Sequence, residues 1–114
     1  MELYLDTSTP DCIVKLTVDG EVFEYHEELG RDMAEKLHGF LRNLFKKHGK
    51  TWQDLTKITY HSGPGSFTGL RIGASVVNAL ADQLKIPLYN HHGEKVPLIV
   101  PDYGRPANIT PPRK

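Results

Sequence analysis

The segment Gly63-Pro64-Gly65-Ser66-Phe67-Thr68-Gly69 comes closest, in this 114-residue chain, to a ligand-binding motif. A glycine-rich turn that leads into a helix can bind phosphate through its backbone N–H groups and the positive end of the helix. The segment nevertheless lacks the Lys-Ser/Thr pair of a P-loop, and its glycines are spaced one residue too far apart for a dinucleotide fingerprint. A tight turn before a helix of small residues is the plainer interpretation.

A second candidate is the polar turn Asp6-Thr7-Ser8, which follows the first predicted strand. A carboxylate there could hold Mg²⁺ through water, whereas an aspartate that stabilises its own turn is the simpler role. Together with the Gly63–Gly69 loop, this turn could form a minimal ATP-binding or ATPase domain. Against that alternative, no glycine lies between Asp6 and Asp19 to let a nucleotide approach closely.

Other residue types suited to chemistry form weaker patterns. Ser66 with His61 as its base lacks an orienting carboxylate, and Ser66 stands where a helix cap belongs. His91 and His92 are adjacent, so in an extended segment they point to opposite faces and chelate one metal poorly. Cys12 is the single cysteine, which excludes a disulfide framework within one chain. We therefore expect no catalytic residue, no metal and no cofactor.

The charge balance limits the classes of partner. Lys and Arg together number 14, as do Asp and Glu, so the formal net charge is zero. Proteins that bind nucleic acid alone usually carry a basic excess, and the neutral balance argues against autonomous RNA binding. The acidic start is unlike a signal peptide, and no apolar stretch approaches the ~20 residues that span a bilayer. We expect a soluble cytoplasmic domain that does not bind membranes.

The elements that must position these residues follow from hydrophobic periodicity and turn signals. Short strands are predicted at 3–5, 13–18 and 21–25, the last two joined by an Asp19-Gly20 hairpin. A helix at about 31–48, a strand at 57–61, a helix from Ser66 or Thr68 to about 84 and a strand at 87–89 complete the order β-β-β-α-β-α-β. This order predicts an α/β fold with a mixed five-stranded sheet in residues 1–90. Residues 91–114 are proline-rich and predict an extended tail.

Two stretches carry a family resemblance that covers about residues 1–90. Leu5-Asp6-Thr7-Ser8-Thr9 and the longer segment from Gly63 to Gly73 resemble the TsaB (YeaZ) family. The resemblance implies a single ribonuclease-H-like lobe of the actin-like ATPase superfamily, and a non-catalytic role in making threonylcarbamoyladenosine in tRNA. The catalytic relative TsaD shares a similar Gly-Pro-Gly motif but needs a His-x-x-x-His metal site, which this sequence lacks. Because the family carries a second lobe after the fifth strand, the resemblance implies a shortened form without it.

The resemblance also implies partners. It predicts a heterodimer with a TsaD-like catalytic subunit, a TsaE-like ATPase in the larger complex, indirect contact with tRNA, and a possible homodimer of the isolated chain. In the family, the two helices of this lobe contact TsaD. The second helix is apolar or small nearly all the way round, which favours cover by a partner or, equally, by the first helix and the tail. The expected contact residues are Met33, Leu37, Gly69, Leu70, Arg71, Gly73, Ala74, Val77, Asn78 and Ala81, with tail contacts from Tyr103, Arg105 and Asn108.

Overall fold

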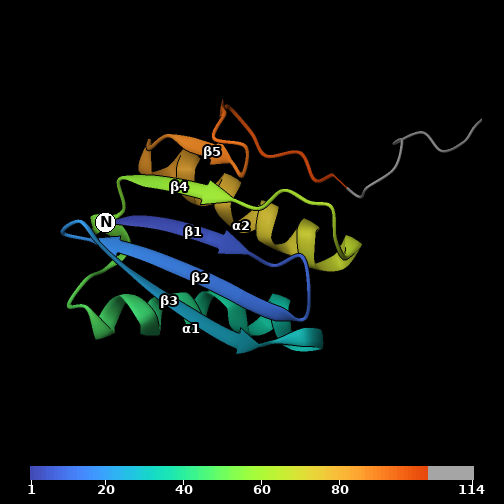
Figure 1. Cartoon of the computed structure of the whole chain (residues 1–114), viewed down its shortest axis with the longest axis horizontal. Helices are drawn as coiled ribbons and strands as arrows, with labels where there is room; N and C mark the ends of the chain where they lie inside the picture. Colours follow the sequence, from blue (N-terminus) through green and yellow to red (C-terminus); the bar gives the residue numbers. More distant parts are fainter. Residues whose placement is uncertain (103–114) are drawn as a thin grey trace, which may run out of the picture.

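Six strands form one mixed sheet, and the two long helices lie behind it on the same face in the view of Figure 1. The computed structural model describes residues 1–102, so the expected contacts of Tyr103, Arg105 and Asn108 lie outside the described residues. The strand order is β3-β2-β1-β4-β5-β6. The elements are β1 Glu2–Asp6, β2 Asp11–Val18, β3 Glu21–Glu28, α1 Met33–Lys47, β4 Lys57–Tyr60, α2 Phe67–Leu84, β5 Leu88–Asn90 and β6 Lys95–Val96.

The local signals of the sequence set these boundaries. Asp19 and Gly20 both have positive φ (52° and 81°), as a tight hairpin between two twisted strands requires. Ser66 caps α2, and its hydroxyl oxygen accepts a hydrogen bond from the Gly69 N–H at 3.3 Å. Antiparallel pairing joins β1 to β2 and β2 to β3, whereas β1 pairs in parallel with β4, and β4 with β5. The predicted mixed sheet with a helical layer is therefore confirmed.

The core lies between the sheet and the two helices. Alternate residues of the central strands, such as Leu5 and Ile58, are fully buried, as are Leu37 and Leu41 of α1. The other face of the sheet carries polar and aromatic side chains, and no helix of the described residues covers it. Within residues 1–102, neither helix has the length and apolar character needed to cross a bilayer.

The segment after β5 differs from the expectation. Residues 95–96 form β6, which pairs antiparallel with β5, so the sheet has six strands rather than five. Ile99 is only 3% exposed in the core, and its N–H and carbonyl bond to the side chain of Asn78 at 2.7 and 3.1 Å. The Asp102 N–H donates to the Ser62 carbonyl at 2.7 Å. The expected boundary after residue 90 thus falls inside a hairpin, and the lobe continues through residues 97–102, here called the strap.

Candidate functional site

The carboxyl ends of β1 and β4 bring the two candidate motifs of the sequence together. The Ser66 N–H donates to the Ser8 carbonyl at 2.8 Å, which joins the glycine loop to the turn after β1. Asp6 Oδ1 accepts hydrogen bonds from the Ser8 N–H at 2.8 Å and from the Ser8 hydroxyl at 2.6 Å. The carboxylate therefore stabilises its own turn, the simpler of the two roles considered for it.

Behind this turn lies a buried group of hydroxyls and carbonyls. The Thr7 hydroxyl donates to the Gly69 carbonyl at 2.6 Å and lies 2.6 Å from the Tyr60 hydroxyl. Tyr60 also donates to the Leu70 carbonyl at 3.0 Å. Burial, the largest cause, raises the pKa of Tyr60 far above its usual value of 10, so the phenol remains a neutral donor. These bonds fasten the first turn of α2 to β1 and β4.

The glycines of the motif permit this close packing. A Cβ on Gly69 would clash with the Thr7 carbonyl oxygen, and a Cβ on Gly73 with the Thr7 and Tyr60 hydroxyls. A Cβ on Gly65 would stand 2.5 Å from the Ser8 Cβ. The close approach that these glycines allow is therefore to the chain's own turn.

The ten expected partner contacts of the two helices differ in their exposure to solvent. Seven of the ten residues are buried, because α1 and α2 pack against the sheet and α2 also packs against the strap. The seven are Met33, Leu37, Gly69, Leu70, Gly73, Ala74 and Val77. These seven are buried within the described chain. Arg71 is exposed, whereas Asn78 and Ala81 are partly exposed, and Asn78 already binds the strap.

A groove of about 420 Å³, here called the helix groove, lies between α1 and α2. His38 and Arg42 come from α1, and the Trp52 ring packs edge-on against buried Phe45 with centroids 5.0 Å apart. This groove could not be predicted from the sequence, because residues of three separate elements form it. Its lining residues are His38, Arg42, Trp52, Gln53, Leu80, Gln83 and Leu84.

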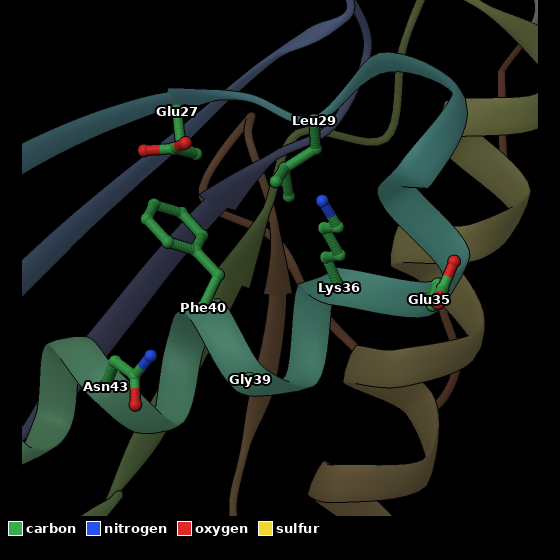
Figure 2. A pocket seen from close by; sticks show the side chains of 7 residues that line it. All are labelled: Glu27, Leu29, Glu35, Lys36, Gly39, Phe40 and Asn43. Atoms are coloured by element: carbon green, nitrogen blue, oxygen red, sulfur yellow. The ribbon is translucent and has the colours of Figure 1, made fainter.

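A second hollow, of about 510 Å³, lies between the end of β3 and α1. Figure 2 shows the Phe40 ring extending from α1 toward Glu27, with Leu29 and Lys36 nearby and Gly39 lacking a side chain on the helix. The hollow contains carboxylates, an amide and a lysine, but no nucleophile with a base beside it. This arrangement suits contact with a polar surface better than chemistry.

Three histidine rings lie together at the carboxyl ends of β4 and β5. The ring centroids of His61 and His91 are 4.4 Å apart, and those of His91 and His92 are 4.1 Å apart. The Ser62 N–H donates to His91 Nδ1 at 3.2 Å, and burial followed by the two neighbouring histidines lowers the pKa of His91. Within residues 1–102, no three His, Cys, Asp or Glu side chains are arranged to hold a metal ion. Parallel pairing of β4 and β5 was the signal that could have placed His61 beside His91.

Comparisons with known proteins agree on one family. A family model described as TsaD, tRNA N6-adenosine threonylcarbamoyltransferase, matches residues 25–95. The "tRNA threonylcarbamoyladenosine biosynthesis protein TsaB" of Escherichia coli K12 is 33% identical over 75% of this chain and 37% of its own length. The Bacillus subtilis protein of the same name is 34% identical over 75% of this chain and 38% of its own.

A solved structure gives the same result. "YeaZ from Pseudomonas aeruginosa" superposes with a TM-score of 0.73 and 35% identity, covering 78% of this chain and 43% of the other. The chain thus spans about two fifths of the length of these relatives.

Proposed function

The chain belongs to the TsaB (YeaZ) branch of the family described as TsaD, tRNA N6-adenosine threonylcarbamoyltransferase, and from this premise we propose that it takes part in the biosynthesis of threonylcarbamoyladenosine in tRNA. Its proposed role is that of a non-catalytic scaffold, which binds a TsaD-like catalytic subunit during threonylcarbamoyl transfer to the adenosine beside the anticodon. A TsaE-like ATPase would join the same complex.

The observation that carries the scaffold role is the packing of the glycine motif. Asp6 is bonded to Ser8, and the glycine positions lie against the Thr7 and Ser8 backbone. The alternative, a minimal ATPase, would need the same loop to bind phosphates, whereas the Ser66 N–H and the glycines of the loop contact the chain's own turn. Among the described residues, Ser66 caps a helix and is not paired with a base.

We assign the partner contact to the helix groove and the exposed residues of α1 and α2 around it. Trp52, Leu84 and Arg42 supply an indole, an aliphatic group and a guanidinium, and Trp and Arg are enriched among residues that dominate interface energies. Arg71 and Ala81, two expected contact residues that remain accessible, lie on other parts of α2, where they line separate hollows. Buried Ala74 is a core residue, so a charged substitution there would test folding rather than association.

The test is isothermal titration of the purified chain with a TsaD-like protein from the same cell. Arg42→Glu reverses a charge in the groove, and we expect at least a tenfold weaker affinity, equivalent to about 1.4 kcal/mol. Arg31→Glu makes the same change at an exposed position outside the groove and should bind normally. If folded Arg42→Glu bound as tightly as Arg31→Glu, the groove would not be the contact. If the unaltered chain bound no TsaD-like protein, the scaffold role would be rejected.

A further inference from the structure

β3 forms one edge of the sheet, and half of its backbone groups face away from β2. It pairs with β2 in register over all eight residues, Glu21–Glu28, and with no other strand of the described chain. An antiparallel pair uses the N–H and carbonyl groups of alternate residues, so the groups of the remaining residues point outward. Within residues 1–102, no backbone hydrogen bond from another segment reaches them. The outer edge of β3, here called the free edge, can therefore receive a further strand.

The hollow between the end of β3 and α1, here called the β3 hollow, lies beside the free edge (Figure 1, Figure 2). Glu27 is paired in register with buried Cys12, so its side chain points to the helix side of the sheet. Gly39 leaves the surface of α1 open here, because the nearest atom to a Cβ on it would be Arg42 Nη2 at 3.9 Å. With a volume of about 510 Å³, the hollow has room for a side chain of an added strand.

The lining of the β3 hollow suits a long cationic side chain. Glu27 and Glu35 are exposed, and neither takes part in an ion pair within the part of the chain that the structure describes. Lys36 of the lining lies 3.6 Å from Asp32. The Phe40 ring extends toward Glu27 in Figure 2. A lysine or arginine can lay its apolar stem along such a ring and bring its charged end to the carboxylates.

A second copy of the chain fits the free edge poorly. β3 has no lysine or arginine, and its carboxylates are Glu21, Glu24, Glu27 and Glu28. If two copies paired antiparallel with full overlap, Glu21 of each copy would lie opposite Glu28 of the other. A shift of one residue would place Glu24 opposite Glu24 and Glu21 opposite Glu27. Like charges directly opposite each other destabilise a strand pair, so these carboxylates oppose self-association and favour a segment that carries a cation.

We propose that the free edge binds an extended peptide segment of another protein, which adds a strand to the sheet and inserts one lysine or arginine side chain into the β3 hollow. The backbone hydrogen bonds supply affinity, and the hollow supplies specificity. Because side chains alternate along a strand, the two neighbours of the inserted residue point to the opposite face of the sheet. The proposal is independent of the proposed function, since other residues of α1 line the helix groove.

The test measures binding of a labelled peptide to the full chain by fluorescence anisotropy. The peptide matches the eight residues of β3 in length and alternates threonine with valine around one central lysine. We expect it to bind about tenfold more tightly, or better, than the same peptide with glutamine in place of the lysine. N-methylation of its backbone nitrogens keeps the charge and removes the donors, so the methylated peptide should also bind about tenfold more weakly or worse.

Two kinds of variant test the β3 hollow. Glu27→Lys with Glu35→Lys reverses its charge, and this variant should prefer a peptide with a central glutamate to the lysine peptide. Glu2→Lys with Asp82→Lys makes the same change at two exposed carboxylates outside the hollow and should keep the preference for lysine. Gly39→Leu fills the hollow, where no backbone blocks a new side chain, and should weaken binding of the lysine peptide about tenfold or more. Its thermal midpoint should stay near that of the unaltered chain.

Several outcomes would overturn the proposal. They are no binding of the lysine peptide by the unaltered chain, equal binding of the methylated peptide, or the same change of preference in both charge-reversed pairs. Peptide affinity that rises when residues 103–114 are removed would assign the free edge to the chain's own tail. A dimer of the unaltered chain that dissociates in Gly39→Leu, measured by sedimentation, would assign it to a second copy.

Titration with a TsaD-like protein separates this proposal from the scaffold role. Gly39→Leu should lose the lysine peptide and bind the TsaD-like protein normally. Arg42→Glu should show the opposite result, because Arg42 lines the helix groove and not the β3 hollow.

Discussion

Individual residues of the glycine motif have a structural role that spacing alone could only outline. Gly69 and Gly73, four residues apart, indicated that something approaches the helix closely. The sequence could not tell whether that neighbour is a phosphate, a partner or the chain itself. It is the chain itself, because parallel pairing of β1 with β4 brings Thr7 over the start of α2. The turn role of Asp6 and the cap at Ser66 depend on neighbouring residues, and both were predicted.

Gly69→Ala should lower the free energy of unfolding by about 1–3 kcal/mol, because the new Cβ meets the Thr7 backbone carbonyl, which cannot rotate away. Gly39→Ala is the matched control within α1, where the nearest atom to a new Cβ is Arg42 Nη2 at 3.9 Å. That control should be neutral or up to about 1 kcal/mol more stable, since alanine favours helix. Urea unfolding of both variants measures the difference. Equal stabilities would show that the clash is relieved at no cost.

His91 should make stability fall in mildly acidic solution. Its folded pKa is lowered by burial and by two neighbouring histidines, so the unfolded chain binds the proton more tightly. Stability should therefore decline as pH falls through about 6.5, the ordinary histidine value. His91→Gln removes that proton site, so this variant should lose less stability than the unaltered chain when the pH is lowered from about 7.5 to about 5.5. Thermal unfolding at several pH values measures the difference.

His26 offers a control of the opposite sign. Hydrogen bonds that the His26 ring donates to the Glu24 and Asp11 carboxylates raise the pKa of His26. Its contribution to stability is therefore present below the ordinary histidine pKa and is lost as pH rises through the folded pKa. His26→Gln should consequently increase the loss of stability at acid pH. If both variants changed the pH dependence in the same direction, these assignments of the two histidines would be contradicted.

At the scale of elements, the two helices and five longer strands follow from local signals, and the sixth strand does not. The pattern of α1 repeats over four turns, and Asp19-Gly20 is a strong hairpin signal. A two-residue strand such as β6 carries no periodicity, and its existence depends on the edge that β5 presents. The strap likewise depends on Asn78, whose side chain binds both polar backbone groups of Ile99.

Shortening the chain tests the strap. Truncation after Val100 keeps Ile99 in the core and should change the thermal midpoint only slightly, although it removes the Asp102 bond to Ser62. We expect the same truncation to weaken the complex with a TsaD-like protein. Truncation after Pro97 removes Ile99 and leaves the Asn78 amide without its partners, which should cost about 2–4 kcal/mol. Equal melting of the two truncated chains would show that the strap contributes nothing to the core.

For the whole molecule, the amino-acid composition shows which charges are present, whereas the strand order shows which of them lie together. Equal numbers of acidic and basic residues argued against RNA binding, and on the open face of the sheet Lys15 is paired in register with Glu24, and Lys57 with Glu2. Net charge cannot show such pairs, because they depend on which strands become neighbours. The family resemblance predicted the lobe and its helical layer, whereas the residues accessible to a partner required knowledge of which helix positions are buried.

The last prediction concerns ATP and the molecule as a whole. The purified chain should neither hydrolyse ATP nor bind it tightly in the presence of Mg²⁺, because the Asp6 carboxylate already accepts two hydrogen bonds from Ser8 and the glycine loop is bonded to the same turn. Isothermal titration measures binding, and phosphate release measures turnover. Asp6→Ala, with exposed Asp82→Ala as its control, would then change stability rather than activity. ATP turnover that disappeared in Asp6→Ala and persisted in Asp82→Ala would make this lobe an enzyme, since it would show that the turn opens to admit a nucleotide.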